Sequence, residues 1–315
     1  MSSNSSVSEL ALLSGLHSAK AAVLAMARGD SPVHAVLLYG AEGSGKTELS
    51  RILAKAWLCT NPGEEGACGE CRTCAAFGRD RCADFQSLGP WGPSRLIKMH
   101  AVRDLPPEPT DPFLGIAILR FFNMPALMAR TKVVILNEAD RMNDKANNAL
   151  LKTLEEPPPY GKLILTTTSV GQIPPTILSR CLALACELPL ASELGDQTEA
   201  ESLLSGGSPG IVKRIRSRPE VYDRLTQFAA SLAGHELGAA LALSDEFRDL
   251  CAEIGKADDL NTRAANTEGL KLLATALSKT GAPAAWIQAT AEAHRRIQGN
   301  AGAGHVFDAL FSAMV

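Results

Sequence analysis

A glycine-rich loop at residues 40–47 is the feature that most constrains what this chain can fold into. The segment reads Gly-Ala-Glu-Gly-Ser-Gly-Lys-Thr and fits the pattern G-x-x-x-x-G-K-[ST]. Its glycines are Gly40, Gly43 and Gly45. Backbone N–H groups in such loops surround a phosphate, so we expect Lys46 to pair with the β- and γ-phosphates and Thr47 to bind Mg²⁺. The loop therefore predicts a site for ATP and Mg²⁺. The alternatives are a chance loop and a relic kept for the fold.

The segments around this loop predict an α/β domain with a parallel sheet. Apolar runs that suit buried strands lie at 35–39, 132–136 and 162–168. Residues 47–57 carry apolar side chains at helical spacing directly after the loop. Residues 144–156 indicate a second helix, which the prolines at 157–159 stop. Strands that alternate with helices are typical of parallel sheets.

Both ends of the chain are predicted to be helical. Apolar spacing favours one helix over residues 9–29, which Asp30, Ser31 and Pro32 would end. After Pro189 only helical patterns are found, and residues 89–112, rich in proline, have no assignment. We therefore predict three domains: a phosphate-loop domain at 1–189, a small helical domain at 190–219 and an all-helical domain at 220–315.

The second element of a phosphate site is altered in this sequence. The run 133–136 is followed by Asn137 and Glu138, where an acidic residue normally ends the strand and holds Mg²⁺. An amide has the shape of a carboxylate but no charge, so it binds a metal ion less strongly. Glu138 still stands where a water-activating base belongs. We expect ATP hydrolysis by this chain to be weak or absent. The alternative is that both residues only cap the strand.

Four cysteines predict a structural zinc site. They have the pattern C-x8-C-x2-C-x2-C and are Cys59, Cys68, Cys71 and Cys74. Two successive C-x2-C turns bring three thiolates around one point, and the first cysteine closes the tetrahedron. The module spans 59–82 and needs a metal because it lacks a core of its own. Alternatives are unligated thiols, or Cys82 in place of one ligand.

Charge and composition exclude several classes of protein. The net charge is −3 and aromatic residues make up 5% of the 315 residues. A protein that coats nucleic acid by charge is basic, and one that stacks single-stranded bases needs aromatic side chains. The first residues resemble no signal peptide, and no apolar run approaches about 20 residues. These observations predict a cytoplasmic protein with no membrane contact.

Four features together resemble the clamp-loader family of bacterial DNA polymerase III, a branch of the AAA+ proteins. They are the phosphate loop, the four-cysteine module, the segment Asn-Ala-Leu-Leu-Lys-Thr-Leu-Glu-Glu-Pro-Pro at 148–158 and Ser-Arg-Cys at 179–181. The resemblance covers residues 10–215. It implies that Arg180 acts in trans as an arginine finger on ATP bound by a neighbouring subunit. It also places Ser169 at a position that senses the γ-phosphate.

The resemblance further implies a helical lid at 190–219 and a collar at 220–315 that joins five subunits. In the motor subunits tau and gamma, the lid motif Gly-Ser-x-Arg carries an arginine that contacts nucleotide. This chain has glycine there, Gly210. Together with Asn137, this departure favours the delta-prime branch, the stator of a hetero-pentamer with tau/gamma and delta subunits. Such a complex loads the sliding clamp onto primed DNA.

Two other interpretations stay open from the sequence. A gamma/tau-like motor with its own ATPase activity is favoured by Lys46, Thr47 and Glu138. A free-standing zinc and phosphate-loop protein that binds DNA is the second. Several basic residues are candidates for non-specific contacts to DNA. They are Lys145 and Lys152 on the helix at 144–156, and Lys213, Arg214, Arg216 and Arg218 in the lid. For the lid residues, a neighbouring subunit or a solvated helix face is the alternative.

Overall fold

The computed structural model folds into two compact units, residues 1–189 and residues 190–315. The structure describes residues 6–28, 32–92, 94–106, 113, 115–232, 239–299 and 301–314. The last residue of the helix expected at 9–29, the helix-ending Asp30 and Ser31, and parts of the proline-rich stretch (93, 107–112) lie outside these ranges. Within the described residues, no helix is both long and apolar enough to cross a membrane.

A five-stranded parallel sheet forms the centre of the first unit, in the order β2-β3-β4-β1-β5. Its strands are β1 (Ala35–Tyr39), β2 (Phe85–Leu88), β3 (Lys132–Leu136), β4 (Gly161–Thr167) and β5 (Leu182–Ala185). In the register of β1, Leu37 pairs with Leu165 of β4 and Ala183 of β5. The parallel sheet expected from the three apolar runs is thus present. The two strands that were not predicted, β2 and β5, are four residues long and only partly buried; β2 is half polar, and β5 is apolar but short.

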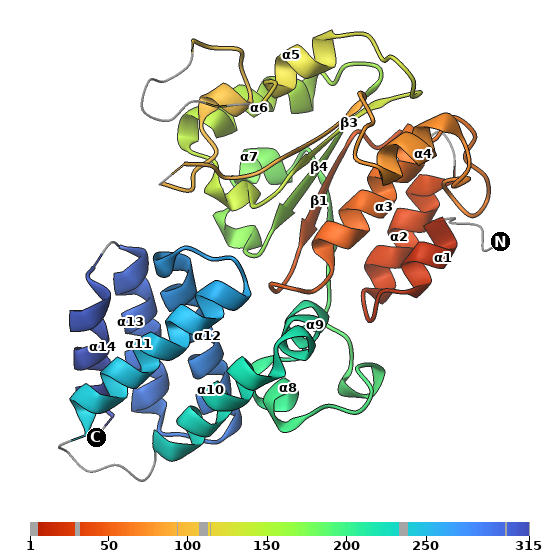
Figure 1. Ribbon diagram of the computed structural model, residues 1–315. Helices are drawn as coiled ribbons and strands as arrows, with labels where there is room; N and C mark the ends of the chain where they lie inside the picture. The colour runs from red at the N-terminus through yellow and green to blue at the C-terminus, as the bar shows by residue number, and fades with distance from the viewer. Residues whose placement is uncertain are drawn as a thin grey trace. The chain divides into compact units, whose positions relative to one another are not determined.

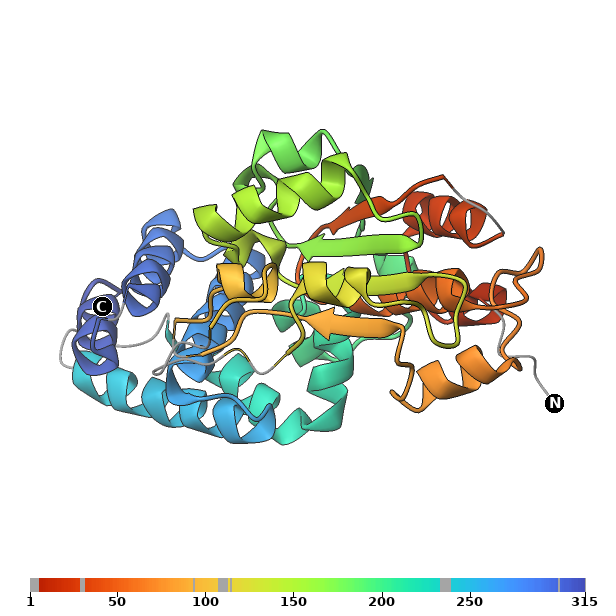
Figure 2. The same ribbon diagram turned by 90° about the horizontal axis from the view of Figure 1, so that it is seen from above.

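Helices cover both faces of this sheet (Figure 1, and from above in Figure 2). They are α1 (Ser6–Ala11), α2 (His17–Ala27), α3 (Lys46–Leu58), α4 (Arg72–Gly78), α5 (Ile118–Asn123), α6 (Asp144–Glu155) and α7 (Pro175–Leu178), with short 3-10 turns at Met99–Ala101, Ala139–Arg141 and Val170–Gln172. Alternate residues of β1 point to opposite sides: Leu37 packs with α5, α6 and α7, while Val36 and Leu38 pack with α2 and α3. Because helices cover both faces of the sheet, the parts left for a site are the ends of its strands.

The single helix expected over residues 9–29 is instead two helices, α1 and α2. The chain turns at Gly15 and Leu16, whose φ angles are 65° and 60°. A side chain at Gly15 would lie 2.7 Å from the backbone nitrogen of Pro189, so glycine is required there. The apolar spacing continues through the break, so the sequence pattern did not indicate this turn.

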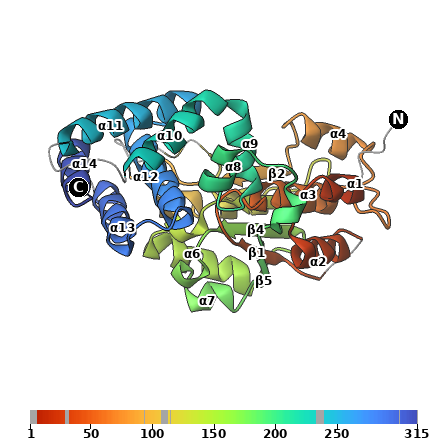
Figure 3. The ribbon, with the colours of Figure 1, turned by 90° about the horizontal axis from the view of Figure 1, so that it is seen from below.

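The second unit is helical in all the regular structure described for it (Figure 3). Its elements are a 3-10 turn at Ala191–Glu193 and the helices α8 (Glu199–Leu204), α9 (Pro209–Ser217), α10 (Pro219–Ser231), α11 (Ala240–Ala257), α12 (Thr262–Lys279), α13 (Ala284–Gln298) and α14 (Ala303–Ser312). Phe247 is fully buried against Phe228, Phe307 and Phe311, with ring centres 5.0–5.5 Å from it. Leu204 and Ile215 belong to the same core, so the short helices α8 and α9 pack with the longer ones.

Candidate functional site

The phosphate loop lies between β1 and α3, at the carboxyl end of β1. A side chain at Gly40 would approach the carbonyl oxygen of Cys186 to 2.3 Å, and its φ is 155°, so only glycine fits. Lys46 is 8% exposed and its Nζ donates to the carbonyls of Gly40 and Ala41, at 2.8 and 2.6 Å. Burial lowers the pKa of Lys46, although nearby acidic groups, including Asp140, act in the opposite direction. The loop thus places a cation and the start of α3 where a phosphate would be bound.

Thr47 is the second residue of α3 and is exposed, in the position from which a hydroxyl binds Mg²⁺ in such loops. ATP supplies the phosphates and Mg²⁺ neutralises them when such a site is filled. The loop has the backbone turns expected of an anion site: Gly43 and Gly45 have φ angles of 70° and 95°. The metal-binding part depends on the end of β3.

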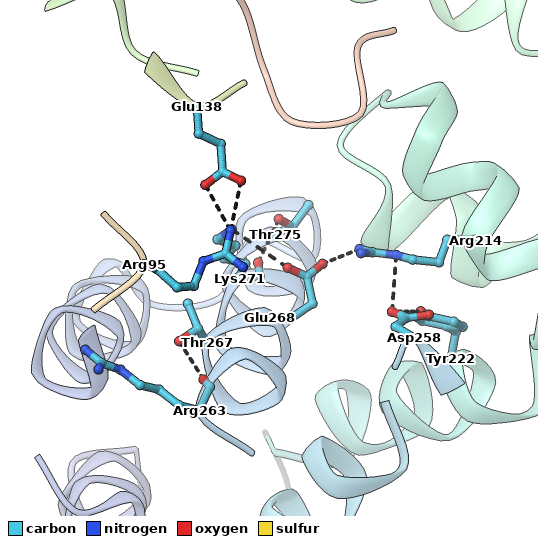
Figure 4. Close-up of polar contacts among 10 residues, drawn as sticks. All are labelled: Arg95, Glu138, Arg214, Tyr222, Asp258, Arg263, Thr267, Glu268, Lys271 and Thr275. Carbon is cyan, nitrogen blue, oxygen red and sulfur yellow. Dashed lines mark hydrogen bonds and ion pairs between the residues drawn. The ribbon is translucent and has the colours of Figure 1, made fainter. Parts of the chain in front are cut away.

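The end of β3 carries the two residues expected to complete a hydrolytic site, and both have other partners. Asn137 donates from Nδ2 to the hydroxyl of Ser87 at 3.0 Å and to the carbonyl of Leu88 at 3.1 Å. The carboxylate of Glu138 pairs with Nη2 of Arg95, at 2.9 and 3.2 Å (Figure 4). The amide is therefore bound to β2, and the expected base is bound to an arginine.

The sequence did not indicate two polar residues beside this site. Thr167, at the end of β4, donates to a carboxylate oxygen of Asp140 at 2.6 Å. Asp140 is one of the charges that act on Lys46. Ser169, the expected sensor, is tied here through its backbone, since its N–H donates to Thr167 Oγ1 at 3.0 Å. The signal for Thr167 was three consecutive threonines at a strand end.

Arg180 lies at the other end of the sheet, just before β5. Its Nη1 donates to the carbonyl of Thr176 at 2.8 Å and to the hydroxyl of Ser179 at 3.2 Å. Its Nη2 is 2.8 Å from a carboxylate oxygen of Glu155. An open groove of about 700 Å³ runs beside it, lined by residues 33–35, 154–155 and 179–182.

The groove and the phosphate loop are separated by the length of β1. Residues 33–35 lead into this strand, and the loop follows its last residue, Tyr39. A five-residue strand spans about 16 Å. Arg180 therefore cannot reach a phosphate held by the loop of its own chain.

The four cysteines expected to bind metal lie together. The sulfur atoms of Cys59, Cys68, Cys71 and Cys74 are all within 4.8 Å of one another. Cys59 Sγ is 3.5 Å from Cys68 Sγ and 3.9 Å from Cys71 Sγ. Tetrahedral thiolates around Zn²⁺ at 2.3 Å would be about 3.8 Å apart, so the spacing fits this ion.

Backbone hydrogen bonds hold these thiols in place, although burial raises the pKa of Cys59 and Cys74. Cys59 follows the last residue of α3 and Cys71 caps the start of α4, and backbone N–H groups donate to their sulfur atoms at 3.4 Å. Burial alone would raise the pKa of Cys71. Hydrogen bonds from Thr60 and Cys74 outweigh burial and lower this pKa to about 5. Cys82 lies outside the group, in the core beside Phe77.

A family model described as "DNA polymerase III, delta subunit" matches residues 17–188, more than half of the chain. The chain belongs to the DNA polymerase III clamp-loader family. The match spans the phosphate loop, the cysteine group and Arg180, which are the features just described.

Individual relatives agree with this family. The DNA polymerase III subunit delta' of Pseudomonas aeruginosa is 37% identical over 198 residues, which are 59% of this chain and 56% of the relative. The DNA polymerase III subunit gamma of Buchnera aphidicola (subsp. Acyrthosiphon pisum) is 37% identical over 149 residues, 47% of this chain and 37% of the relative. The chain thus matches 56% of the length of the first relative and 37% of the length of the second.

A solved structure shows the same fold over nearly the whole chain. It is the crystal structure of a DNA polymerase III gamma subunit-related protein of Thermotoga maritima, with a TM-score of 0.50 and 16% identity. The alignment covers 94% of this chain and 98% of that protein. The helical second unit is therefore included in the fold that this chain shares with that structure.

Two of the basic residues considered as contacts to DNA, a neighbour or solvent also form ion pairs within the second unit. Arg214 on α9 forms ion pairs with Glu268 of α12 and, at 3.4 Å, with Asp258 at the end of α11 (Figure 4). Tyr222 donates from its hydroxyl to Asp258 at 2.9 Å. Arg216 pairs with the buried Glu201 of α8 at 2.7 Å. Spacing along a helix did not reveal these partners, since they come from other elements.

Proposed function

We propose that this chain is the stator of a clamp loader, of the delta-prime type, and that it presents Arg180 to ATP bound by a neighbouring motor subunit. One observation carries the proposal: the arginine of the Ser-Arg-Cys motif faces an open groove at the end of the sheet away from its own phosphate loop. An arginine in that place serves a phosphate brought by another molecule. A planar guanidinium suits the charge that develops on a γ-phosphate during transfer.

The chain's own nucleotide site supports a passive role. Lys46 and the loop can hold phosphate, but Asn137 offers a metal ion no charge and Glu138 is paired with Arg95. The start of α9 carries Gly210 where motor subunits have an arginine. We therefore propose that the chain binds ATP and Mg²⁺ weakly, if the loop is filled, and hydrolyses it slowly or not at all.

The cysteine group is proposed to hold one structural Zn²⁺. Four thiolates fill a tetrahedral site, so no position is left for a substrate or a reactive water. The metal would join the end of α3 to the start of α4 through Cys59 and Cys71. Its function in this proposal is stability of the module at 59–82.

The remaining assignments follow the family. Residues 190–219 are proposed as the lid and residues 220–315 as the collar that joins the tau/gamma and delta partners in a hetero-pentamer. The complex would place the sliding clamp on primed DNA in the cytoplasm. Lys145 and Lys152 are exposed on α6 and are proposed to contact DNA phosphates without sequence preference.

The test is DNA-stimulated ATP hydrolysis by a reconstituted loader made with its motor, delta and clamp partners. Arg180→Ala in this chain should lower the rate while the complex stays assembled, as judged by gel filtration. An unchanged rate would show that Arg180 serves no occupied site and would reject the stator role.

A gamma-like motor is the second candidate, because Lys46 and Thr47 keep the arrangement of a working loop. It predicts that the purified chain hydrolyses ATP and that Lys46→Ala abolishes this activity. It also predicts several copies of this chain in each loader, whereas a stator is present once.

A further inference from the structure

The partner of Arg180 on α6 points to a second residue with a role in the same site. The carboxylate of Glu155 is 2.8 Å from Nη2 of Arg180. We propose that Glu155 is a positioning residue, which holds the Arg180 guanidinium in the orientation needed to meet a neighbour's phosphate. This inference rests on the proposed function, because it concerns how the arginine is held and not which reaction it serves.

The guanidinium is fixed at two corners by two different elements. Nη1 donates to Thr176 and Ser179, both in or next to α7. Nη2 is held by Glu155, the last residue of α6. A long side chain anchored at one corner can still swing about its remaining bonds, whereas a planar group held at two corners has its orientation set. Without Glu155, only the contacts to α7 would remain.

The position of Glu155 is itself fixed by the backbone. α6 begins at the cap Asn143, whose side chain accepts a hydrogen bond from Ala146, and it ends where Pro157 stops the helix. Leu154 beside it is buried in the core of the sheet. The carboxylate therefore comes from a rigid element and not from a loop, which is what a positioning group requires.

The pair leaves the arginine able to bind a second anion. The side chains of Arg180 and Glu155 are 34% and 49% exposed, so water competes for both and the ion pair is not sealed. A guanidinium has five N–H donors. Its Nε–H has no partner among the residues that the structure describes, and both side chains line the groove. An incoming phosphate can thus share the guanidinium with the carboxylate.

The chain supplies a matched control for this contact. Glu156 has the same charge, is also exposed and follows Glu155 directly, but its backbone has left the helix, with φ −125° and ψ 72°. No ion pair joins it to Arg180 within the described residues. Glu156→Gln removes one negative charge from this region, as Glu155→Gln does, but it leaves the ion pair between Glu155 and Arg180 in place.

The experiment isolates the ATP site that this chain serves. A loader is assembled in which the arginine of the motor subunits' own Ser-Arg-Cys motifs is replaced by alanine, so that the remaining DNA-stimulated hydrolysis depends on Arg180. In this loader Arg180→Ala should lower kcat by about 10³-fold. Glu155→Gln should lower kcat by about 10- to 100-fold with little change in the KM for ATP, because a misdirected group weakens the transition state more than substrate binding. Glu156→Gln should keep full activity, and Glu155→Asp should recover part of it.

The double variant tests whether the two residues act together. If Glu155 acts through Arg180, Glu155→Gln with Arg180→Ala is no slower than Arg180→Ala alone. If the losses in kcat of the two single variants instead multiply in the double variant, Glu155 only supports the fold. Full activity of Glu155→Gln would also overturn the positioning role. A faster Glu155→Gln loader would also overturn it, since Glu155 would then be a restraint. Failure of Arg180→Ala to lower the rate would instead reject the stator function itself, and the inference with it.

Discussion

The two ends of the parallel sheet carry different groups, which the proposed function assigns to two different nucleotide sites. The end with the phosphate loop has a cation, Lys46, and glycines that surround an anion, but a neutral amide stands where a metal-binding acid belongs. The end with the groove has Arg180, and the residues that line this groove include no phosphate loop. Each end therefore needs something that the other end cannot bring, since β1 keeps them about 16 Å apart.

This difference shows how a fold can keep one part of a reaction and give up another. The groups near the phosphate loop are bound among themselves: Glu138 to Arg95, Asn137 to β2 and Thr167 to Asp140. Apart from the buried Thr167 these groups are partly exposed, and their contacts join β2, β3 and β4 at this end even without catalysis. Arg180 is paired as well, but it lines an open groove. The proposed function therefore uses the groove end.

The strongest way to break this comparison is to disable each end separately in the assembled loader. Arg180→Ala should reduce hydrolysis at the neighbouring site by about 10³-fold or more. Lys46→Ala in this chain should leave the loader's rate within about twofold, because the ATP held here is not the one hydrolysed. A large loss from Lys46→Ala would mean that the end of the sheet with the phosphate loop, and not the end with the groove, is the active one.

Metal removal should affect the two ends unequally. Zn²⁺ is expected at one equivalent per chain by elemental analysis, and Cys71→Ser should lose it and cost about 3 kcal/mol of stability, or roughly 6–12 °C in melting temperature. Because Cys59 directly follows α3, hydrogen exchange should speed up in that helix and not in α7. Cys181→Ser, outside the cysteine group, should keep the metal. An intact wild-type protein free of zinc would contradict the assignment.

Restoring the missing charge should make the two ends more alike. Asn137→Asp should raise Mg²⁺-dependent ATP affinity by about 10-fold, since a carboxylate binds the metal ion where an amide does not, as measured by calorimetry. It should also cost about 1–2 kcal/mol in stability, because the donors to Ser87 and Leu88 are lost. Asn148→Asp, on the exposed side of α6, is the control for added charge. Equal affinity in the three proteins would show that the loop does not bind the metal.

The smallest effect concerns alkaline pH. Burial lowers the pKa of Lys46 in the folded chain, so at pH values between this lowered pKa and the ordinary pKa of lysine the unfolded chain holds the proton and the folded chain does not. Stability should therefore rise with pH in that window by a few tenths of a kcal/mol or more relative to Lys46→Met. Stability is measured by urea unfolding. If the free energy of unfolding changes with pH in the same way for the wild-type protein and for Lys46→Met, the result would contradict the burial of Lys46.

Much of the fold could be predicted because its signals are local. The phosphate loop requires glycines at fixed positions, and the runs at β1, β3 and β4 are apolar throughout since both faces of the sheet are covered. β2 and β5 were not predicted, because an edge strand has only one neighbouring strand and is less buried. The break between α1 and α2 escaped because it depends on Pro189, which is distant in sequence.

The site could be predicted in residue types but not in partners. The positions of Arg180, Asn137 and the four cysteines follow from motifs. The contacts that decide their chemistry, Glu155 with Arg180 and Arg95 with Glu138, join residues 25 and 43 positions apart through the folded sheet. No spacing rule relates such pairs, because they depend on how strands and helices are arranged in space.

The ion pairs of Arg214 have a consequence for anyone who wishes to exchange parts between relatives. The planar fork of this arginine neutralises two acids that the longer helices provide, Glu268 and Asp258, while Tyr222 shares the second acid. A hybrid chain joined near residue 219 would bring a foreign α9 to these acids; without an arginine at this place, Asp258 would lose this ion pair and Glu268 would keep Lys271, at 3.8 Å, at a cost of up to about 3–5 kcal/mol. Residues 190–315 are therefore best exchanged as one unit, and a junction placed before α8 keeps these ion pairs together.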